Sequence, residues 1–178
     1  AGKVARGTGS ASGMSLACAN RFAEAGMNVA LPDIEREPRA MAEAGIRANG
    51  GKTLAVRTNV MSADEINRLA DAAFSSFGNV HILCNNAGVG GGSGLPIWDA
   101  PLSDFEWVFG VNFMGTLHGI RAFVPRMIAN GEEGHIVNTA SMAGLVGGAS
   151  PYTIPKHPVR SPPPGLDRQR RGDGKEGR

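Results

Sequence analysis

Tyr152 and Lys156 are the residues whose types and spacing suggest chemistry most directly, because they stand four positions apart. On a helical turn, that spacing puts both side chains on one face. A lysine ammonium near a phenol favours the phenolate, so it lowers the pKa of the tyrosine toward a range useful for acid–base catalysis. Such pairs also arise by chance, but Tyr152 is the only tyrosine in the sequence. The pair predicts a site of proton transfer.

A glycine-rich segment near the N-terminus, Thr8-Gly9-Ser10-Ala11-Ser12-Gly13-Met14-Ser15, is a second candidate site. We expect it between a short first strand near Gly2 to Ala5 and a helix that starts at Met14. A glycine turn that enters a helix lets backbone N–H groups and the helix dipole meet a pyrophosphate, since no Cβ blocks the approach. Taken alone, the segment is more typical of an ordinary turn, because glycine-rich turns are common.

Asp33 adds a carboxylate 20 residues past Gly13, at the expected end of the second strand. A carboxylate there can accept hydrogen bonds from the adenosine ribose hydroxyls and repel a 2′-phosphate, which favours NAD over NADP. Asp33 can also serve as the N-cap of a helix beginning near Glu35, and the two roles are compatible. Arg36 and Arg39 lie close enough to keep NADP as the lesser alternative.

Short aliphatic runs alternate with longer helical patterns along the first 150 residues. Beyond the weak first strand, the runs predict strands at Met27–Leu31, Thr53–Val56, Val80–Cys84 and His135–Asn138. The patterns between them predict helices at Met14–Ala25, Arg39–Ala48, Ala63–Phe77 and Ser103–Ala129. This order implies parallel strands with right-handed crossovers, and therefore an open α/β sheet covered on both faces.

Two further groups of polar and small residues follow predicted strands. Asn85-Asn86-Ala87-Gly88 comes directly after the fourth strand, and Ser141 follows the fifth. Ligands of open α/β sheets bind beyond the carboxyl ends of the strands, where small residues let a nucleotide pass close to the backbone. The sequence therefore predicts that these groups border one ligand site.

In this order and at these distances, the motifs resemble those of the short-chain dehydrogenase/reductase family. The shared features are a turn like T-G-x-x-x-G-x-G, an acid after strand two, N-N-A-G, a helical Asn, a Ser and Y-x-x-x-K. The resemblance covers about residues 2–157 but not the last part of a usual member, so the chain looks truncated. It implies a Rossmann-like, doubly wound parallel sheet of about five strands in a three-layer αβα arrangement.

The resemblance also implies a function, namely NAD(P)-dependent interconversion of a secondary alcohol and a carbonyl by hydride transfer. Tyr152 would be the general acid and base, and Lys156 would lower its pKa and hold the nicotinamide ribose. Ser141 would orient and polarise the substrate oxygen. Asn112 would hold a water that links Lys156 to solvent. The cofactor-binding residues implied are Gly9, Ser12, Gly13, Met14, Asp33, Asn59, Val60, Asn86, Ala87, Gly88, Tyr152 and Lys156.

Several positions depart from the family pattern. Ser15 replaces the third glycine of the first motif, which adds a side chain where helix and strand should touch. Arg6 and Gly7 stand where buried aliphatic residues are usual, so the first strand looks weak, and an arginine buried without a partner is costly. Pro158 would clash with the carbonyl of Ile154 in a continuing helix, which should cut that helix short.

Length and composition limit the remaining possibilities. The 178 residues suit one domain, which we place at residues 1–157. Residues 157–178 hold 6 basic and 3 acidic side chains and several prolines, so we expect a disordered tail from residue 158. The rest of the chain has 12 basic and 13 acidic side chains, which does not favour nucleic-acid binding.

No apolar run is long enough to span a membrane, and two cysteines cannot form a disulfide framework, so we expect a cytoplasmic protein. The expected partner is a small-molecule alcohol or carbonyl compound, with a homo-oligomer possible. His81, His118 and His135 show no metal-ligand spacing, so no metal site is predicted. Two alternatives stay open: an inactive dinucleotide-binding fragment, and nucleic-acid binding through the basic tail.

The composition change at His157 leads to a testable hypothesis, that the tail results from a frameshift or a sequencing error. We expect that the coding DNA, translated in another frame from about His157, gives an amphipathic helix in place of the proline-rich sequence. Resequencing the gene and translating all three frames checks this, and the hypothesis fails when neither alternative frame yields such a helix.

Overall fold

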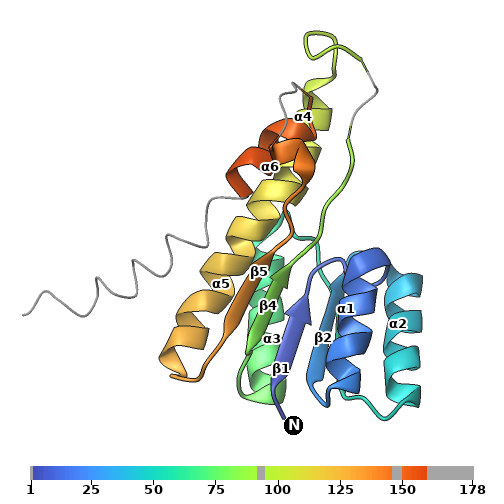
Figure 1. Ribbon diagram of the computed structural model, residues 1–178, viewed down its shortest axis with the longest axis vertical. Coiled ribbons are helices and arrows are strands. Elements are labelled where there is room, and N and C mark those ends of the chain that lie inside the picture. Colours follow the sequence, from blue (N-terminus) through green and yellow to red (C-terminus); the bar gives the residue numbers. More distant parts are fainter. Residues whose placement is uncertain (1, 92–94, 146–149, 160–178) are drawn as a thin grey trace, which may run out of the picture.

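Five parallel strands form the centre of the protein, in the order β3-β2-β1-β4-β5 (Figure 1). The structure is a computed structural model that describes residues 2–91, 95–145 and 150–159. The strands are β1 (Val4–Gly7), β2 (Asn28–Asp33), β3 (Thr53–Arg57), β4 (Ile82–Asn85) and β5 (His135–Asn138). The helices are α1 (Gly13–Glu24), α2 (Arg36–Ala48), α3 (Ala63–Phe77), α4 (Leu102–Phe109), α5 (Gly115–Ala129) and α6 (Thr153–Val159).

The predicted parallel α/β sheet is confirmed. Strand β1 lies two residues further along than expected, so that it ends at Gly7, opposite Cys84 of β4. The chain builds β2 and β3 on one side of β1, then crosses over to build β4 and β5 on the other. The boundary between β1 and β4 is therefore the topological switch point, where open α/β sheets bind ligands.

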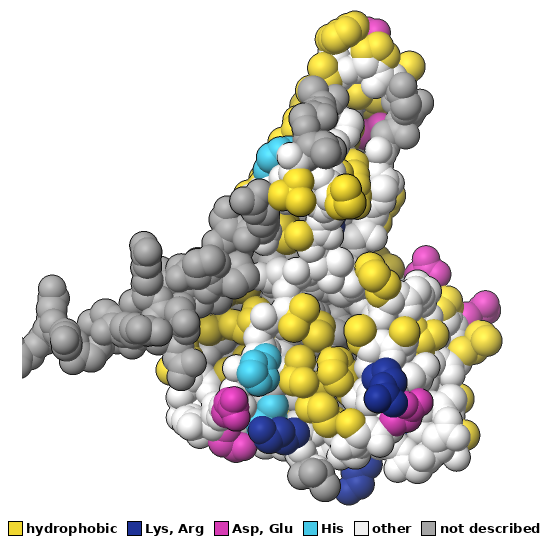
Figure 2. Space-filling view, in the orientation of Figure 1, with side chains coloured by type: hydrophobic (Ala, Val, Ile, Leu, Met, Phe, Trp, Pro, Cys, Tyr) yellow, Lys and Arg dark blue, Asp and Glu magenta, His cyan; other side chains and the backbone are white. Residues whose placement is uncertain are grey.

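Helices pack on both faces of the sheet (Figure 1). On one face, α1 and α2 cover β2 with a small core that includes Leu31, Ala19 and Ile46. On the other face, the larger core under α3 and α5 includes Leu83 and Phe123. Figure 2 shows apolar side chains at the surface on the α1 side of the sheet. Val137 of the edge strand β5 is half exposed.

The long helix predicted from Ser103 to Ala129 is interrupted. An α-helix ends at Phe109, a π-helical segment η1 (Gly110–Met114) follows, and α5 continues to Ala129. The helix begins at Leu102, one residue before the predicted start, and its N-cap position is Pro101. Single π turns inside helices are frequent at functional sites, and this one carries Asn112.

Arg6 does not prevent β1 from forming, although its side chain is fully buried. Its Nη1 donates a hydrogen bond of 3.0 Å to Asn85 Oδ1, and its guanidinium lies 4.7 Å from the ring centroid of Phe123. The Nε and Nη2 groups have no hydrogen-bond partner among the described residues. Burial lowers the pKa of Arg6 to about 9. Arg6 is therefore buried with one hydrogen bond and one aromatic ring as its contacts, and its cost to stability stays a prediction.

No helix among the described residues is both long enough and apolar enough to cross a membrane.

Replacing Arg6 should raise the stability of the protein. We expect Arg6→Met to increase the free energy of unfolding at pH 7 by about 2 kcal/mol, since a buried cation is exchanged for an apolar side chain of similar length. The native arginine loses its proton near its lowered pKa, before the unfolded chain does, so the wild type gains stability above pH 9. The difference in free energy of unfolding between Arg6→Met and the wild type should then decrease by about 1 kcal/mol from pH 8 to pH 10.

Urea denaturation of both proteins at pH 7, 8 and 10 measures this difference. Arg6→Lys is the control that keeps the charge, and it should not be stabilised. A less stable Arg6→Met protein would contradict the prediction, because the cation would then contribute more than its burial costs.

Candidate active site

The glycine-rich turn lies between β1 and α1, at the carboxyl edge of the sheet. Gly9 and Gly13 have φ angles of +66° and +54°, which favour glycine. A Cβ on Gly9 would lie 3.3 Å from the Cα of Ala87, so the turn touches the loop after β4. Ser12, Gly13 and Met14 are exposed at the beginning of α1. The structure thus places these predicted residues around an open helix N-terminus, which suits an anion.

Thr8 joins the turn to the loop after β4. Its hydroxyl oxygen accepts hydrogen bonds from the backbone N–H groups of Asn86 and Ala87, each at 2.9 Å, and lies 3.5 Å from the carbonyl oxygen of Cys84. The carbonyl oxygen of Thr8 accepts a bond of 2.7 Å from the Ser15 hydroxyl. The extra side chain at the third glycine position is therefore buried but satisfied.

Asp33 lies at the end of β2, with its carboxylate directed toward the glycine-rich turn. Oδ2 accepts a hydrogen bond of 2.9 Å from the backbone N–H of Ala11, and Oδ1 accepts one of 3.0 Å from Glu35. The alternative role as N-cap is not found, because α2 begins at Arg36 and its N-cap position is Glu35. Both carboxylate oxygens are instead held by backbone groups at the rim of the sheet.

Asn59 and Val60 follow β3 and make contacts within the protein. Asn59 Oδ1 accepts a hydrogen bond of 3.0 Å from the backbone N–H of Met61 and closes a turn. Val60 is buried in the larger core, and its carbonyl oxygen lies 3.0 Å from His118 Nδ1. Both residues shape the rim beside β2, and Asn59 is the more exposed of the two.

Lys156 is the best-defined of the predicted catalytic residues. Only 4% of its surface is exposed, and Nζ donates a hydrogen bond of 3.5 Å to the Thr139 carbonyl oxygen. A Cβ on Gly88 would lie 3.4 Å from Lys156 Nζ and 3.2 Å from Asn112 Oδ1. The amide of Asn112 forms a pair of hydrogen bonds with the backbone of Val89, at 2.8 and 3.0 Å. Gly88, Asn112 and Lys156 are thus brought together from three separate elements.

Tyr152 immediately precedes α6, so the spacing of four residues does place its side chain near Lys156. The ammonium nitrogen of Lys156 lies 5.7 Å from the centroid of the phenol ring. Burial lowers the pKa of Lys156, and the charge interaction with Tyr152 opposes that change. Helix α6 includes Pro158 and Val159, so it extends two residues past the domain boundary suggested by the sequence, whereas residues 160–178 of the predicted tail lie outside the described residues.

Ser141 lies beyond the end of β5 and begins a short 3-10 turn, η2 (Met142–Gly144). Its hydroxyl oxygen accepts a hydrogen bond of 3.2 Å from the backbone N–H of Ala143. The turn packs against α6, the helix that follows Tyr152. Ser141 is therefore on the correct edge of the sheet, with its hydroxyl occupied in capping this turn.

A family model described as short chain dehydrogenase matches residues 3–161. A 1-deoxy-11-beta-hydroxypentalenate dehydrogenase of Streptomyces avermitilis is 40% identical over 152 residues, which are 84% of this chain and 56% of that protein. A C alpha-dehydrogenase of a Sphingobium species is 36% identical over 86% of this chain and 51% of its own length. The chain belongs to the short-chain dehydrogenase family. It spans a little over half the length of these relatives.

Solved structures of family members agree with the fold. A short-chain dehydrogenase/reductase from Burkholderia phymatum in complex with NAD superposes with a TM-score of 0.90 at 43% identity, over 96% of this chain and 61% of that one. A metagenomic short-chain oxidoreductase in complex with NADP gives a TM-score of 0.89 at 29% identity, over 97% and 78% of the two chains. Structures with this fold therefore include complexes with either dinucleotide.

Other residues that organise the site in this family member were not singled out from the sequence. In the sequence, Thr8 stands out only as part of the glycine-rich segment, yet its hydroxyl accepts hydrogen bonds from the loop after β4. Thr139 binds Lys156 through its carbonyl and Asn86 through its hydroxyl, at 2.7 Å from Asn86 Oδ1. Val89 holds the amide of Asn112. Backbone contacts of this kind leave no residue-type signal, although the T-G pair at Thr8 was visible.

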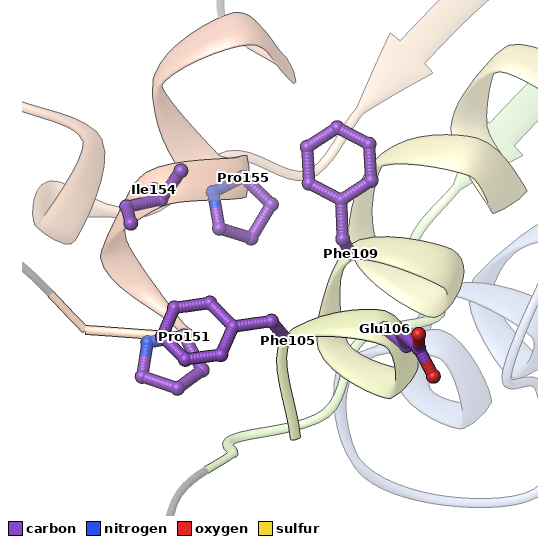
Figure 3. A pocket seen from close by; sticks show the side chains of 6 residues that line it. All are labelled: Phe105, Glu106, Phe109, Pro151, Ile154 and Pro155. Atoms are coloured by element: carbon purple, nitrogen blue, oxygen red, sulfur yellow. The ribbon is translucent and has the colours of Figure 1, made fainter. Parts of the chain in front are cut away.

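An apolar pocket of about 250 Å³ lies between α4 and α6 (Figure 3). Its lining residues are Phe105, Glu106, Phe109, Pro151, Ile154 and Pro155. In the view of Figure 3, the carboxylate of Glu106 points away from the two phenyl rings. Pro151 immediately precedes Tyr152, and Pro155 immediately precedes Lys156. The segment that carries both candidate catalytic residues therefore forms one wall of this pocket.

The Thr8 hydroxyl should be essential for the junction between the glycine-rich turn and the loop after β4. We expect Thr8→Val, which keeps the shape and removes the hydroxyl, to lower the free energy of unfolding by about 1–3 kcal/mol, because two backbone N–H groups lose their acceptor. Urea denaturation measures the loss.

Thr8→Ser is the matched control, since it keeps the hydroxyl and removes only a methyl group. It should remain within about 1 kcal/mol of the wild type. A Thr8→Val protein as stable as the wild type would contradict the prediction, because the hydroxyl would then not be needed as an acceptor.

Proposed function

We propose that this protein is an NAD(P)-dependent oxidoreductase that interconverts a secondary alcohol and a carbonyl compound by hydride transfer. The observation that carries the proposal is the buried ammonium of Lys156, which lies beside the ring of Tyr152 and within reach of Gly88 and Asn112. A charged lysine is rarely buried without a function or a partner. Membership of a family whose relatives are named dehydrogenases supports the proposal.

The residues at the rim of the sheet fit a dinucleotide. Gly9 and Gly13 present backbone without a Cβ, and the open N-terminus of α1 suits a pyrophosphate. The carboxylate of Asp33, held by two backbone N–H groups, is ready to accept hydrogen bonds from ribose hydroxyls. Asn86, Ala87 and Gly88 would line the path toward Lys156. When bound, the nicotinamide group supplies or accepts the hydride.

Proton transfer is assigned to the phenol oxygen of Tyr152. In reduction, the phenol gives its proton to the carbonyl oxygen of the substrate, and in oxidation the phenolate takes the proton of the alcohol. The Lys156 ammonium would stabilise the negative charge that develops on the phenol oxygen during proton transfer. Burial of Lys156 strengthens this interaction, since few water molecules screen it.

Ser141 and Asn112 have supporting roles in the proposal. The Ser141 hydroxyl would orient and polarise the substrate oxygen once it turns from the backbone N–H of Ala143. Asn112 fixes the loop after β4 through Val89, and its placement next to Gly88 and Lys156 suits the relay of protons from Lys156 toward solvent. We infer NAD as the preferred cofactor, because the negative charge of Asp33 would repel the 2′-phosphate of NADP.

A dinucleotide-binding protein without turnover is the second candidate. One observation favours it: the Ser141 hydroxyl is engaged with the backbone N–H of Ala143. The two candidates share the cofactor site and differ only in the proton-transfer group.

Tyr152→Phe separates these candidates. We expect the wild type to melt cooperatively, and NADH at about 100 times its dissociation constant to add about 2.7 kcal/mol of stability. Tyr152→Phe should keep this stabilisation and lose at least about 100-fold in turnover, since only the acid–base group is removed. Thermal melts with and without NADH, together with assays of alcohols and ketones, measure both effects.

Lys156→Met removes the positive charge and keeps a side chain of similar length. It should lose turnover, although the phenol of Tyr152 stays in place. Turnover retained by Tyr152→Phe would remove Tyr152 from its proposed role. A wild-type protein that binds NADH but turns over no alcohol or ketone would favour the second candidate.

A further inference from the structure

Arg6, Asn85 and Asn138 form a polar row, a line of three side chains across the neighbouring strands β1, β4 and β5 (Figure 1). Arg6 Nη1 donates a hydrogen bond of 3.0 Å to Asn85 Oδ1, and Asn85 Nδ2 donates one of 2.9 Å to Asn138 Oδ1. The two asparagines are direct partners in the register of β4 and β5. Each member belongs to a different strand, so the polar row crosses the boundary between β1 and β4.

Arg6 sets the direction of these hydrogen bonds. A guanidinium can only donate, whereas the amide of an asparagine has an acceptor oxygen on one side and a donor NH2 group on the other. With Arg6 in place, Asn85 turns Oδ1 toward it and Nδ2 toward Asn138. Asn138 then turns its own Oδ1 toward Asn85. A residue that only donates, at one end of the row, therefore fixes the orientation of both amides.

The polar row leads to the residues around Lys156. The backbone carbonyl oxygen of Asn85 accepts a hydrogen bond of 3.0 Å from the N–H of Thr139. Thr139 follows Asn138, and its own carbonyl oxygen accepts the 3.5 Å hydrogen bond of Lys156 Nζ. Its hydroxyl donates a bond of 2.7 Å to Asn86 Oδ1, in the loop after β4. Each asparagine of the row is thus followed directly by a residue that borders the candidate active site.

Helix α5 leaves space for the hydrogen bond between Arg6 and Asn85 at Gly119. A Cβ at this position would overlap Asn85 Oδ1 and would lie 3.3 Å from Arg6 Nη1. One turn later in α5, the ring of Phe123 lies 4.7 Å from the guanidinium. Glycine is unfavourable inside a helix compared with alanine. The helix therefore accommodates the polar row with a residue that an ordinary apolar contact would not require.

We propose that Arg6 is a positioning residue for the candidate active site. It fixes the amides of Asn85 and Asn138, and the backbone that follows them then holds the Lys156 ammonium in place. The proposal rests on the function proposed above. A misplacement of about 1 Å caused by a mutation far from the reacting atoms can cost about a hundredfold in rate. Turnover and stability should therefore change in opposite directions when Arg6 is removed.

Arg6→Met tests the proposal because it removes the donor and keeps a side chain of similar length. We expect kcat to fall by about tenfold or more, since a small displacement near the reacting groups slows the chemical step. The KM for NADH should change by less than about threefold, because the residues that would bind the cofactor are intact. Arg6→Lys is the matched control. A lysine also only donates, so its kcat should stay within about threefold of the wild type.

Asn138→Leu breaks the polar row at its other end and leaves the charge of Arg6 in place. We expect it to lower kcat as much as Arg6→Met does. The double variant should lose no more than either single variant, within about twofold, because the effects of residues in one hydrogen-bond network are not additive. Steady-state kinetics with alcohols and ketones measure kcat and KM, and urea denaturation establishes that each variant is folded.

The outcomes are distinguishable. A folded wild type that turns over no alcohol or ketone would overturn the proposed function and this inference together. An active wild type whose kcat is retained in Arg6→Met, or is lost equally in Arg6→Lys, would overturn the inference alone. Additive losses in the double variant would also overturn it, because Arg6 and Asn138 would then act independently.

Discussion

The junction between β1 and β4 through the Thr8 hydroxyl is the constraint on which the site depends. One oxygen accepts two backbone N–H groups of the loop after β4, and Gly9 next to it lets that loop pass at van der Waals distance. Because β1 and β4 are the strands at which the chain changes direction across the sheet, this contact joins the two halves of the fold. The glycine-rich turn and the loop after β4 are therefore joined by direct hydrogen bonds.

Close packing around Gly88 links the loop after β4 to the candidate catalytic residues. A Cβ on Gly88 would lie 3.2 Å from Asn112 Oδ1 and 3.4 Å from Lys156 Nζ, so the backbone packs closely against both side chains. Asn112 holds Val89 from the π-helical segment η1. The ammonium of Lys156 is buried by these neighbours, which lowers its pKa and keeps its charge poorly screened. A cation in such surroundings influences a nearby phenol far more than the same cation in solvent would.

Buried polar groups also carry a cost in this fold, and Arg6 is the clearest case. Its hydrogen bond to Asn85 continues to Asn138, because Asn85 Nδ2 donates to Asn138 Oδ1 at 2.9 Å. This row of hydrogen bonds crosses β1, β4 and β5. Within the described residues, Nε and Nη2 of Arg6 and the amide nitrogen of Asn138 have no hydrogen-bond partner. The side-chain hydrogen bonds that link the three strands thus leave some buried hydrogen-bond donors unsatisfied.

The sequence by itself determined the parallel sheet, its strand segments and the edge at which the motifs meet, because periodicity and strand ends depend on local residue types. It also indicated that Tyr152 and Lys156 share a helical face. Tertiary structure alone decided that Ser15 is satisfied by Thr8, that a π turn interrupts the predicted helix at Asn112, and that Arg39 binds the Asp33 carbonyl. These features depend on contacts between distant segments, which no local pattern of residues encodes.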